Sequence, residues 1–472
     1  MYNVIFYDKV KEVVESEEVI ERRYNSDGTY TDTVVTNDIT RKYRVPTKFV
    51  FETATSCDKF MQGFTVIDDF QADMPSLNSA ISMFENSSIT SISGASGGVA
   101  DFQSLTSADY MFKNCKQLTS ININAPSLVS VEDFINGCES LQSFSGSLES
   151  LINGSRMFAD FTSLNSFSAD LDNLEDGTEM FKNTSLTVFS SLLPSLVNGT
   201  RMFADTLVET FNLNCPNLAF ADSMFENCKS LNNISINTPL LKTAEYMFKN
   251  TSLATCSLNC SGLKFASEMF SGTPLTTFSG DLGQLIIGDN MFASNEDNFG
   301  ATLSTFNVKG LDNLETADGM MGAVQFEKWT LDMPVLRSAV NMFASQVISE
   351  EETIYPALTS FESDLQSLVN GTEMFKDCVN LTSFNAALPS LQQARDMFTN
   401  CKLDADSVMY IAETLPYYPE TEAKDITIGI NCASSNIDSF LSSTGVYVDL
   451  ADFEKRLYDK GWNLTLVYNP AE

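Results

Sequence analysis

The chain has 472 residues, with 28 Lys and Arg against 62 Asp and Glu, which gives a formal net charge of −34. Such a surface argues against nucleic acid and anionic lipid as partners, because phosphate binding depends on Lys and Arg displacing counterions. There is no histidine, which removes the commonest general base and transition-metal ligand. We expect the acidity to serve solubility; cation binding or attraction to a basic partner are the alternatives.

The N-terminal region carries Asp8 and Lys9 and has no long apolar run, so no secretory signal is visible. If Met1 is the natural start, we expect a protein made in a cytoplasm that does not leave by the general secretory route. Strand-forming residues at 19–24 and 29–34 flank an Asn-Ser-Asp-Gly turn, which predicts a β-hairpin. Residues 1–50 are therefore expected to be a β-rich cap or an attachment module.

A Met-Phe pair recurs along the chain with a period of 22 or 23 residues. Its clearest copies begin at Met111, Met157, Met180, Met202, Met224, Met247, Met269 and Met291. A fixed period of this size is typical of a solenoid, in which each unit is too small to bury its own apolar face and stacks on its neighbours. With 43% hydrophobic residues, including 35 Phe, the chain can build such a core. The anchor Phe is expected inside, against the Phe of adjacent coils.

We count fifteen coils between residues 51 and 402, an α/β repeat with a parallel β-sheet. The second residue of each pair is taken as the anchor: Met61, Phe84, Phe112, Ile135, Phe158, Phe181, Phe203, Phe225, Phe248, Phe270, Phe292, Met321, Phe343, Phe375 and Phe398. Alternating apolar residues such as Ile121 and Ile123 predict one short strand per coil.

Several anchors follow an Asn-Gly-Ser or Asn-Gly-Thr triplet, at 153–155, 198–200 and 370–372. We expect the Asn and Gly to take left-handed backbone, and the hydroxyl to cap one short helical turn that carries Met-Phe. The triplets also match the N-glycosylation acceptor pattern, but their periodic placement favours the turn.

The ten cysteines are expected to be reduced, buried packing residues rather than a disulfide framework. Five occupy one slot, three residues after the anchor: Cys115, Cys138, Cys228, Cys378 and Cys401. Other coils place Thr there, so the slot favours a small, semi-polar side chain. Cys215 and Cys260 share a second slot. Neither spacing resembles a zinc site, and we expect no metal or other cofactor.

Three anchor spacings exceed the period, at 84–112, 292–321 and 343–375. The extra residues are expected to leave the stack as loops, and loops on a rigid solenoid are favoured contact points. The candidate interaction residues are Ser93, Gly94, Ser96, Gly97, Asn295, Glu296, Asp297, Glu350, Glu351 and Glu352. The alternative is that these are surface insertions without function.

After Lys402 the repeat stops. Residues 405–415 and 450–460 have helical patterns, and residues 426–430 and 464–468 have strand patterns. We expect residues 403–472 to form a small α/β cap that closes the edge of the last coil.

The unit resembles the BspA-like leucine-rich repeat family, through segments such as Met111–Leu118 and Met374–Leu381, in which Met-Phe is followed by Cys-x-x-Leu. The resemblance covers about residues 57–402 and implies adhesion or protein binding, because family members are often surface proteins of bacteria and some protists. The end of the chain, Leu457–Trp462, is similar to the ends of repeat proteins encoded by bacteriophages of gut bacteria. A virion component reaches the outside by lysis and needs no secretion signal.

No phosphate loop, Rossmann fingerprint or nucleophile elbow occurs, and a Ser-His or Cys-His pair is impossible without histidine. Asp170, Asp281 and Asp364 take similar repeat positions, as on a solvated face; a Ca²⁺ ladder is the alternative.

From the missing catalytic motifs and the resemblances we expect a non-enzymatic virion protein. Its expected partners are other virion proteins or a host receptor, protein or glycan, with no nucleic acid and no membrane insertion. A homo-oligomer or multi-copy assembly stays open. The alternatives are a bacterial cell-surface adhesin and an intracellular scaffold.

Overall fold

The computed structural model describes residues 4–6, 9–24, 30–45, 48–50, 53–65, 67–293, 302–347 and 352–469. They form two compact units, residues 1–174 and 175–472, and the boundary falls inside the stretch expected to be repetitive.

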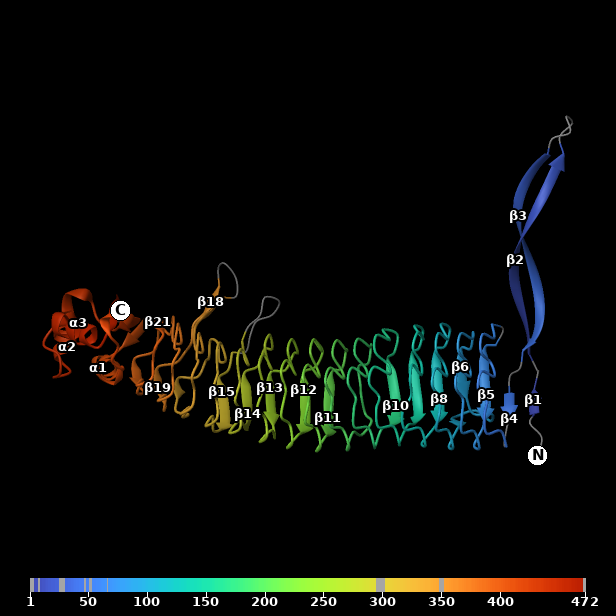
Figure 1. Ribbon diagram of the computed structural model, residues 1–472, viewed down its shortest axis with the longest axis horizontal. Coiled ribbons are helices and arrows are strands. Elements are labelled where there is room, and N and C mark those ends of the chain that lie inside the picture. Colours follow the sequence, from blue (N-terminus) through green and yellow to red (C-terminus); the bar gives the residue numbers. More distant parts are fainter. Residues whose placement is uncertain are drawn as a thin grey trace. The chain divides into compact units, whose positions relative to one another are not determined.

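The first unit contains a mostly parallel sheet and a separate two-stranded ribbon (Figure 1). The sheet has the order β1 (Val4–Phe6), β4 (Lys48–Val50), β5 (Asp69–Asp73), β6 (Ser91–Ser93), β8 (Ser120–Asn124), β9 (Ser143–Ser147), β10 (Ser166–Asp170), with β7 (Ala100–Asp101) also paired to β8. Only β1 and β4 are antiparallel among these described pairs. The ribbon pairs β2 (Lys9–Tyr24) with β3 (Tyr30–Val45), with Tyr24 opposite Tyr30. The hairpin is thus confirmed; its turn, residues 25–29, lies outside the described residues.

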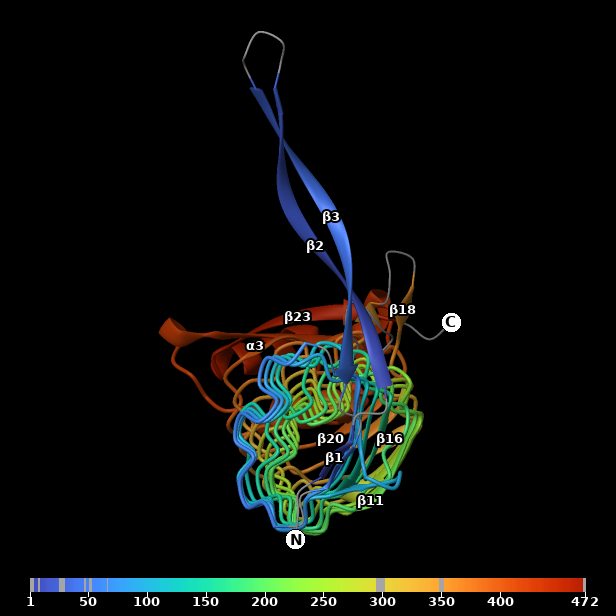
Figure 2. The same cartoon turned by 90° about the vertical axis from the view of Figure 1, so that its right-hand side faces the viewer.

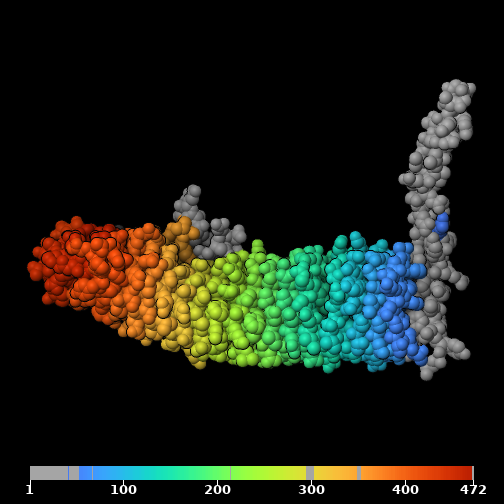
Figure 3. Space-filling view, in the orientation of Figure 1, coloured from blue at the N-terminus to red at the C-terminus, as the bar shows by residue number. Residues whose placement is uncertain are grey.

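The second unit repeats short parallel strands, one per coil. These are β11 (Thr210–Asn214) with β12 (Asn233–Asn237); β13 (Thr255–Leu258), β14 (Thr277–Asp281) and β15 (Thr305–Lys309); and β16 (Lys328–Trp329), β19 (Ser360–Glu362) and β20 (Ser383–Asn385). Single parallel bridges continue from coil to coil on another side, from Asp176 through Asn198 and Phe220 to Gln393. Within each unit the coils overlie one another when viewed along the stack (Figure 2). In the space-filling view, neighbouring coils of a unit touch along the face that is drawn (Figure 3).

The C-terminal part of this unit has the helices and strands predicted from sequence. Its sheet contains β21 (Ala394–Leu403), β22 (Lys424–Ile430) and β23 (Trp462–Tyr468), and its helices are α1 (Ala405–Thr414), α2 (Ile437–Ser442) and α3 (Leu450–Asp459), with single 3-10 turns at Glu420–Glu422 and Ser434–Asn436. The Asp404 carboxylate caps α1 by accepting from the Ser407 N–H. The Ser407 hydroxyl in turn accepts a hydrogen bond of 2.9 Å from the Phe384 N–H of β20, so α1 lies against that strand.

The anchor phenylalanines lie inside, as predicted. Phe203, Phe225 and Phe248 are fully buried, and each ring stacks on the next at 5.6 and 5.7 Å with an interplanar angle of 5°. Phe211 of β11 meets Phe203 of its own coil edge-on at 5.2 Å and Phe225 of the next coil edge-on at 4.7 Å. Edge-on and offset-stacked contacts are the favoured geometries of aromatic pairs, so the same ring packs well both within a coil and between coils.

The Met-Phe segment is a run of consecutive turns, not the expected helical turn. Ser223 and Asn227, on either side of Met224-Phe225, have φ of 55° and 61°, and the Phe225 N–H donates to the Met247 carbonyl of the next coil at 2.9 Å. Left-handed residues turn alternate peptide groups toward the neighbouring coil, where they bond as in a ladder. A regular helix would keep these groups for itself.

The Asn-Gly-Ser/Thr triplets also work differently from the prediction. Gly199 does not have a positive φ; instead, a Cβ there would lie 3.1 Å from the Met224 sulfur of the next coil. The cap is the Asn198 side-chain oxygen, which accepts from the Thr200 N–H at 3.1 Å. Glycine is thus required by close packing between coils, and the asparagine by a local turn.

Candidate binding cleft

The first predicted interaction loop leaves the stack as expected. Gly94 bonds to Gly98 and Gly97 to Gly94 at 3.0 and 2.9 Å, which closes a tight turn between β6 and β7. Ser96 and Gly97 are exposed, while Gly94 is buried. A Cβ at Gly94 would lie 2.5 Å from the Val99 carbonyl oxygen, so this glycine is required by the turn itself.

The other two predicted loops are described only in part. Asn295, Glu296, Asp297, Glu350 and Glu351 lie outside the described residues. The third insertion pairs β17 (Gln346–Val347) with β18 (Thr353–Ile354) as an antiparallel hairpin. Glu352 is exposed directly before β18. Their role as interaction sites stays a prediction.

Sequence reasoning missed a cleft in the first unit, on the side of the coils that carries the Met-Phe turns. Between the coils of Phe112 and Ile135 the turn ladder is intact: Phe112 and Asn114 donate to the carbonyls of Phe134 and Asn136 at 2.8 and 2.7 Å. The next step, from the coil of Ile135 to the coil of Phe158, has none of these bonds among the described residues. The two coils therefore separate on this side.

Six main-chain groups lose their usual partners at this step. Within the described residues, none of them has a hydrogen bond: the N–H groups of Asp133, Ile135 and Gly137, and the carbonyl groups of Ser155, Met157 and Ala159. On the strand side the same coils stay paired, because β9 bonds to β8 and to β10. The result is a wedge that is closed at the sheet and open at the turns.

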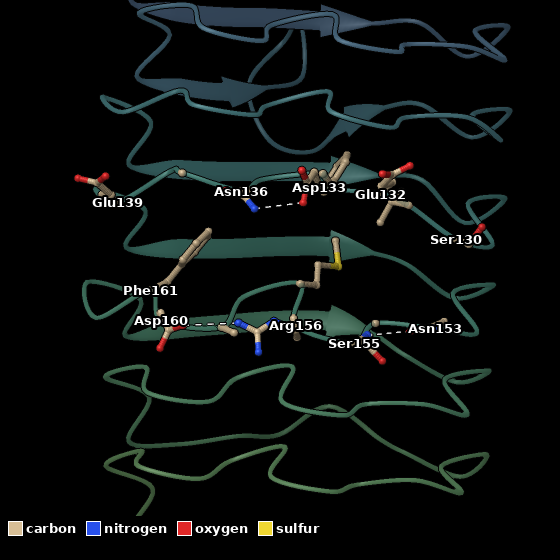
Figure 4. A pocket seen from close by; sticks show the side chains of 16 residues that line it. Ser130, Glu132, Asp133, Asn136, Glu139, Asn153, Ser155, Arg156, Asp160 and Phe161 are labelled. Atoms are coloured by element: carbon tan, nitrogen blue, oxygen red, sulfur yellow. Dashed lines mark hydrogen bonds and ion pairs between the residues drawn. The ribbon is translucent and has the colours of Figure 1, made fainter.

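The open side is a cleft of about 610 Å³. Figure 4 shows its two walls, with Glu132, Asp133, Asn136 and Glu139 from one coil and Asn153, Ser155, Arg156, Asp160 and Phe161 from the next. Met157 lines it and is half-buried, whereas Met111 and Met180 are fully buried. Phe134 and Phe161 are only 2% and 8% exposed, so the cleft offers no open aromatic face.

The coil that opens differs from the others at Val131. From Phe84 onward, every other anchor has Ala or Gly four residues earlier, whereas Ile135 has Val131. This position faces the methionine of the next coil: a Cβ at Gly177 would lie 2.8 Å from the Met202 sulfur. A valine adds two methyl groups where even a Cβ is tight, and closely packed interiors do not absorb such volume. We infer that Val131 wedges the coils apart.

The rim of the cleft is acidic. Glu132, Glu139 and Asp160 line it, with Arg156 3.9 Å from Asp160 as the opposing charge. Asp133 accepts a hydrogen bond of 2.6 Å from Lys113, which, together with Asn136, lowers the pKa of Asp133. The Tyr110 hydroxyl donates to Glu132, and this bond, with nearby carboxylates, raises the pKa of Tyr110 to about 12. The Asp133 carboxylate is therefore ionised at neutral pH.

Other sites have simpler explanations. A hollow of about 210 Å³ beside α1 and α3 is lined by Glu413, Tyr447, Arg456 and Lys460. There the Tyr447 hydroxyl donates to Glu413, and Lys460 donates to the last carbonyls of α1.

All ten cysteines are free and buried, as predicted. Within the described ranges no group of three Asp, Glu or Cys side chains is placed to hold a metal ion.

The acidic residues for which a calcium ladder was the alternative lie on the surface or hold their own turns. Asp281 and Asp364 accept from the N–H groups of Gly283 and Gln366 at 3.2 and 3.1 Å, and Asp170 is exposed. Among the described residues, no helix combines the length and apolar character needed to cross a bilayer.

Comparison with known proteins finds a family of repeats. Residues 80–198 and 197–307 match the BspA type leucine-rich repeat region, in 6 copies. Proteins of this class are typically non-enzymatic binding or structural proteins. No curated protein sequence matches the chain.

Three solved structures are similar to the whole chain or a part of it. A leucine-rich repeat protein from Bacteroides ovatus has 14% identity and a TM-score of 0.35, over 98% of this chain and 100% of that one. One from Eubacterium ventriosum has 15% identity and a TM-score of 0.29, over 61% and 77%. A leucine-rich cell surface protein from Faecalibacterium prausnitzii has 11% identity and a TM-score of 0.21, over 98% and 96%. TM-scores this low do not establish a common arrangement of the coils.

Proposed function

We propose that this chain is a non-enzymatic protein-binding repeat protein, and that the cleft between the coils of Ile135 and Phe158 is its binding site. The observation that carries the proposal is the set of six main-chain groups left without partners at this step. Peptide groups without hydrogen bonds are costly once they are shielded from water. A ligand that forms hydrogen bonds with these groups gains more binding free energy than it would on the surface of a coil whose groups are already bonded.

We further propose that the protein is a structural component of a bacteriophage virion, in which fifteen stacked coils lie between an attachment module and a C-terminal cap. The β2–β3 ribbon supports an attachment role, because in the part of the chain that is described it pairs with no other strand, and an isolated ribbon is marginally stable in water. The bond from Phe384 to the Ser407 hydroxyl of α1 supports the cap. A bacterial cell-surface adhesin is the alternative, favoured by the BspA-type repeats.

Two measurements test these roles. Mass spectrometry of purified phage particles from a culture that carries the gene is expected to find the protein in stoichiometric amounts. Surface proteolysis of intact host cells tests the adhesin, since an exported protein is cleaved without lysis.

A capture experiment tests the binding role. The tagged full chain is used to capture partners from a host lysate and from disrupted particles, with the Val131→Ala variant as the matched bait. Absence of any partner captured by the original chain above a control without bait would remove the binding role, whereas equal capture by both baits would place binding outside the cleft.

A further inference from the structure

The cleft has features that select one class of ligand, and this inference rests on the binding function proposed above. We propose that it binds a short peptide segment with basic side chains, whose main chain takes the place of the missing coil-to-coil hydrogen bonds.

The main-chain pattern favours a peptide. One wall offers only donors, the N–H groups of Asp133, Ile135 and Gly137, and the other offers only acceptors, the carbonyls of Ser155, Met157 and Ala159. Both sets occur at alternate residues. A polypeptide that adopts the alternating right- and left-handed backbone of these turns supplies carbonyls on one side and N–H groups on the other at the same alternation, whereas an ordinary edge strand presents both groups on each side. The ligand thus copies the bonds that every intact step makes.

The charge of the rim favours basic side chains. Glu132, Glu139 and Asp160 surround the opening with one fixed cation, Arg156, and the protein as a whole carries −34. Opposite charge steers a ligand toward the site and sets its specificity. An acidic peptide would meet repulsion at the same rim.

The floor argues against a neutral glycan. Sugar rings are commonly held on exposed aromatic faces, but Phe134 and Phe161 are almost fully covered. The half-buried Met157 instead offers a flexible apolar contact of the kind used for varied peptide side chains. A neutral sugar also gains nothing from the acidic rim.

Fluorescence anisotropy with labelled peptides of about ten residues, each with two Lys or Arg at varied positions, tests the proposal on the full chain. We expect members of this library to bind, and their counterparts with Glu in place of Lys and Arg to bind at least about tenfold more weakly. Methylation of alternate peptide nitrogens removes the donors to Ser155, Met157 and Ala159, and is expected to weaken binding at least about tenfold.

Two matched pairs of variants locate the site. Val131→Ala removes the wedge and is expected to weaken binding at least about tenfold, whereas Val129→Ala, at an exposed valine of the same coil outside the cleft, leaves it unchanged. Glu139→Gln is expected to weaken binding about two- to threefold in low salt, while Glu149→Gln, outside the cleft, has no effect.

Amide hydrogen exchange reports on the cleft whether or not a variant binds. The N–H groups of Asp133, Ile135 and Gly137 are expected to exchange fast in the free protein, and slowly with peptide bound or in Val131→Ala. The proposal fails if no basic peptide binds, if Val131→Ala or N-methylated peptides bind as well as the originals, or if cellohexaose competes for the cleft. If the full chain still captures a protein partner equally with either bait, the binding function stands and only this site is wrong.

Discussion

The Cys228 thiol donates a hydrogen bond of 3.0 Å to the carbonyl oxygen of Phe203, in the preceding coil. Cys115 and Cys138 make the same bond to Phe84 and Phe112 at 2.9 and 3.0 Å. Where the slot holds threonine, as at Thr206, the hydroxyl binds the anchor carbonyl of its own coil instead, at 2.8 Å. The slot therefore selects a small hydrogen-bond donor, and cysteine uses it to link two coils.

Replacing Cys228 tests this requirement for a donor. Cys228→Val has the shape of threonine but no donor, so relative to Cys228→Thr it is expected to lower the free energy of unfolding by about 0.5–1.5 kcal/mol. Cys228→Thr should cost less, because four other coils carry threonine in the slot. Urea unfolding of both variants is the measurement. Equal losses for Val and Thr would mean that the slot selects by volume alone.

Stability should fall in alkaline solution because of the buried thiols. Burial raises the pKa of Cys215 to about 12 and of Cys228 and Cys260 to about 11. Above pH 9 the unfolded chain loses these protons and the folded chain keeps them, so unfolding is favoured as the pH rises. Each such thiol lowers the free energy of unfolding by about 1.4 kcal/mol per pH unit until its folded pKa is reached.

Urea unfolding between pH 8 and pH 10.5 measures the slope. The Cys228→Thr variant lacks one of these thiols and should lose stability less steeply over the same interval. A stability that is flat over this interval in the original chain would show that the thiols are accessible to solvent.

Closing the cleft should stabilise the first unit. With Val131→Ala, three coil-to-coil hydrogen bonds can form, each worth about 0.5–1.5 kcal/mol, against the loss of one half-buried side chain. We expect a net gain of about 1–3 kcal/mol in the free energy of unfolding. Val129→Ala serves as the control. A destabilisation by Val131→Ala would show that the opening has another cause.

Gly429 in β22 should not tolerate a side chain. A Cβ there would lie 2.6 Å from the carbonyl oxygens of Cys401 and Phe398 in β21, and backbone atoms cannot move aside as side chains do. Gly429→Ala is expected to lower the free energy of unfolding by about 3 kcal/mol or more. Gly283→Ala, whose Cβ would meet nothing closer than 3.4 Å, should change it by about 1 kcal/mol at most. Thermal unfolding of the pair, monitored by circular dichroism, compares them, and equal losses would contradict the close approach of β21 and β22.

The sequence by itself determined the stack. The spacing of residues such as Phe203 and Phe225 required a repeating core, and the slot of Cys228 required a small semi-polar residue, because both are set by one chemical type recurring at one interval. The helices and strands after Lys402 also followed from local periodicity, and the structure places α1 and α3 within one residue of their expected ends.

Only the tertiary structure decided the form of the turns and the position of the cleft. Left-handed φ at Ser223 depends on peptide groups that bond to the next coil, and the role of Gly199 depends on the Met224 side chain of that coil. Val131 differs from its alanine counterparts by two methyl groups, a change that sequence patterns treat as minor. The effect that we infer for it depends on volume at a contact between coils, and that contact exists only once the chain is stacked.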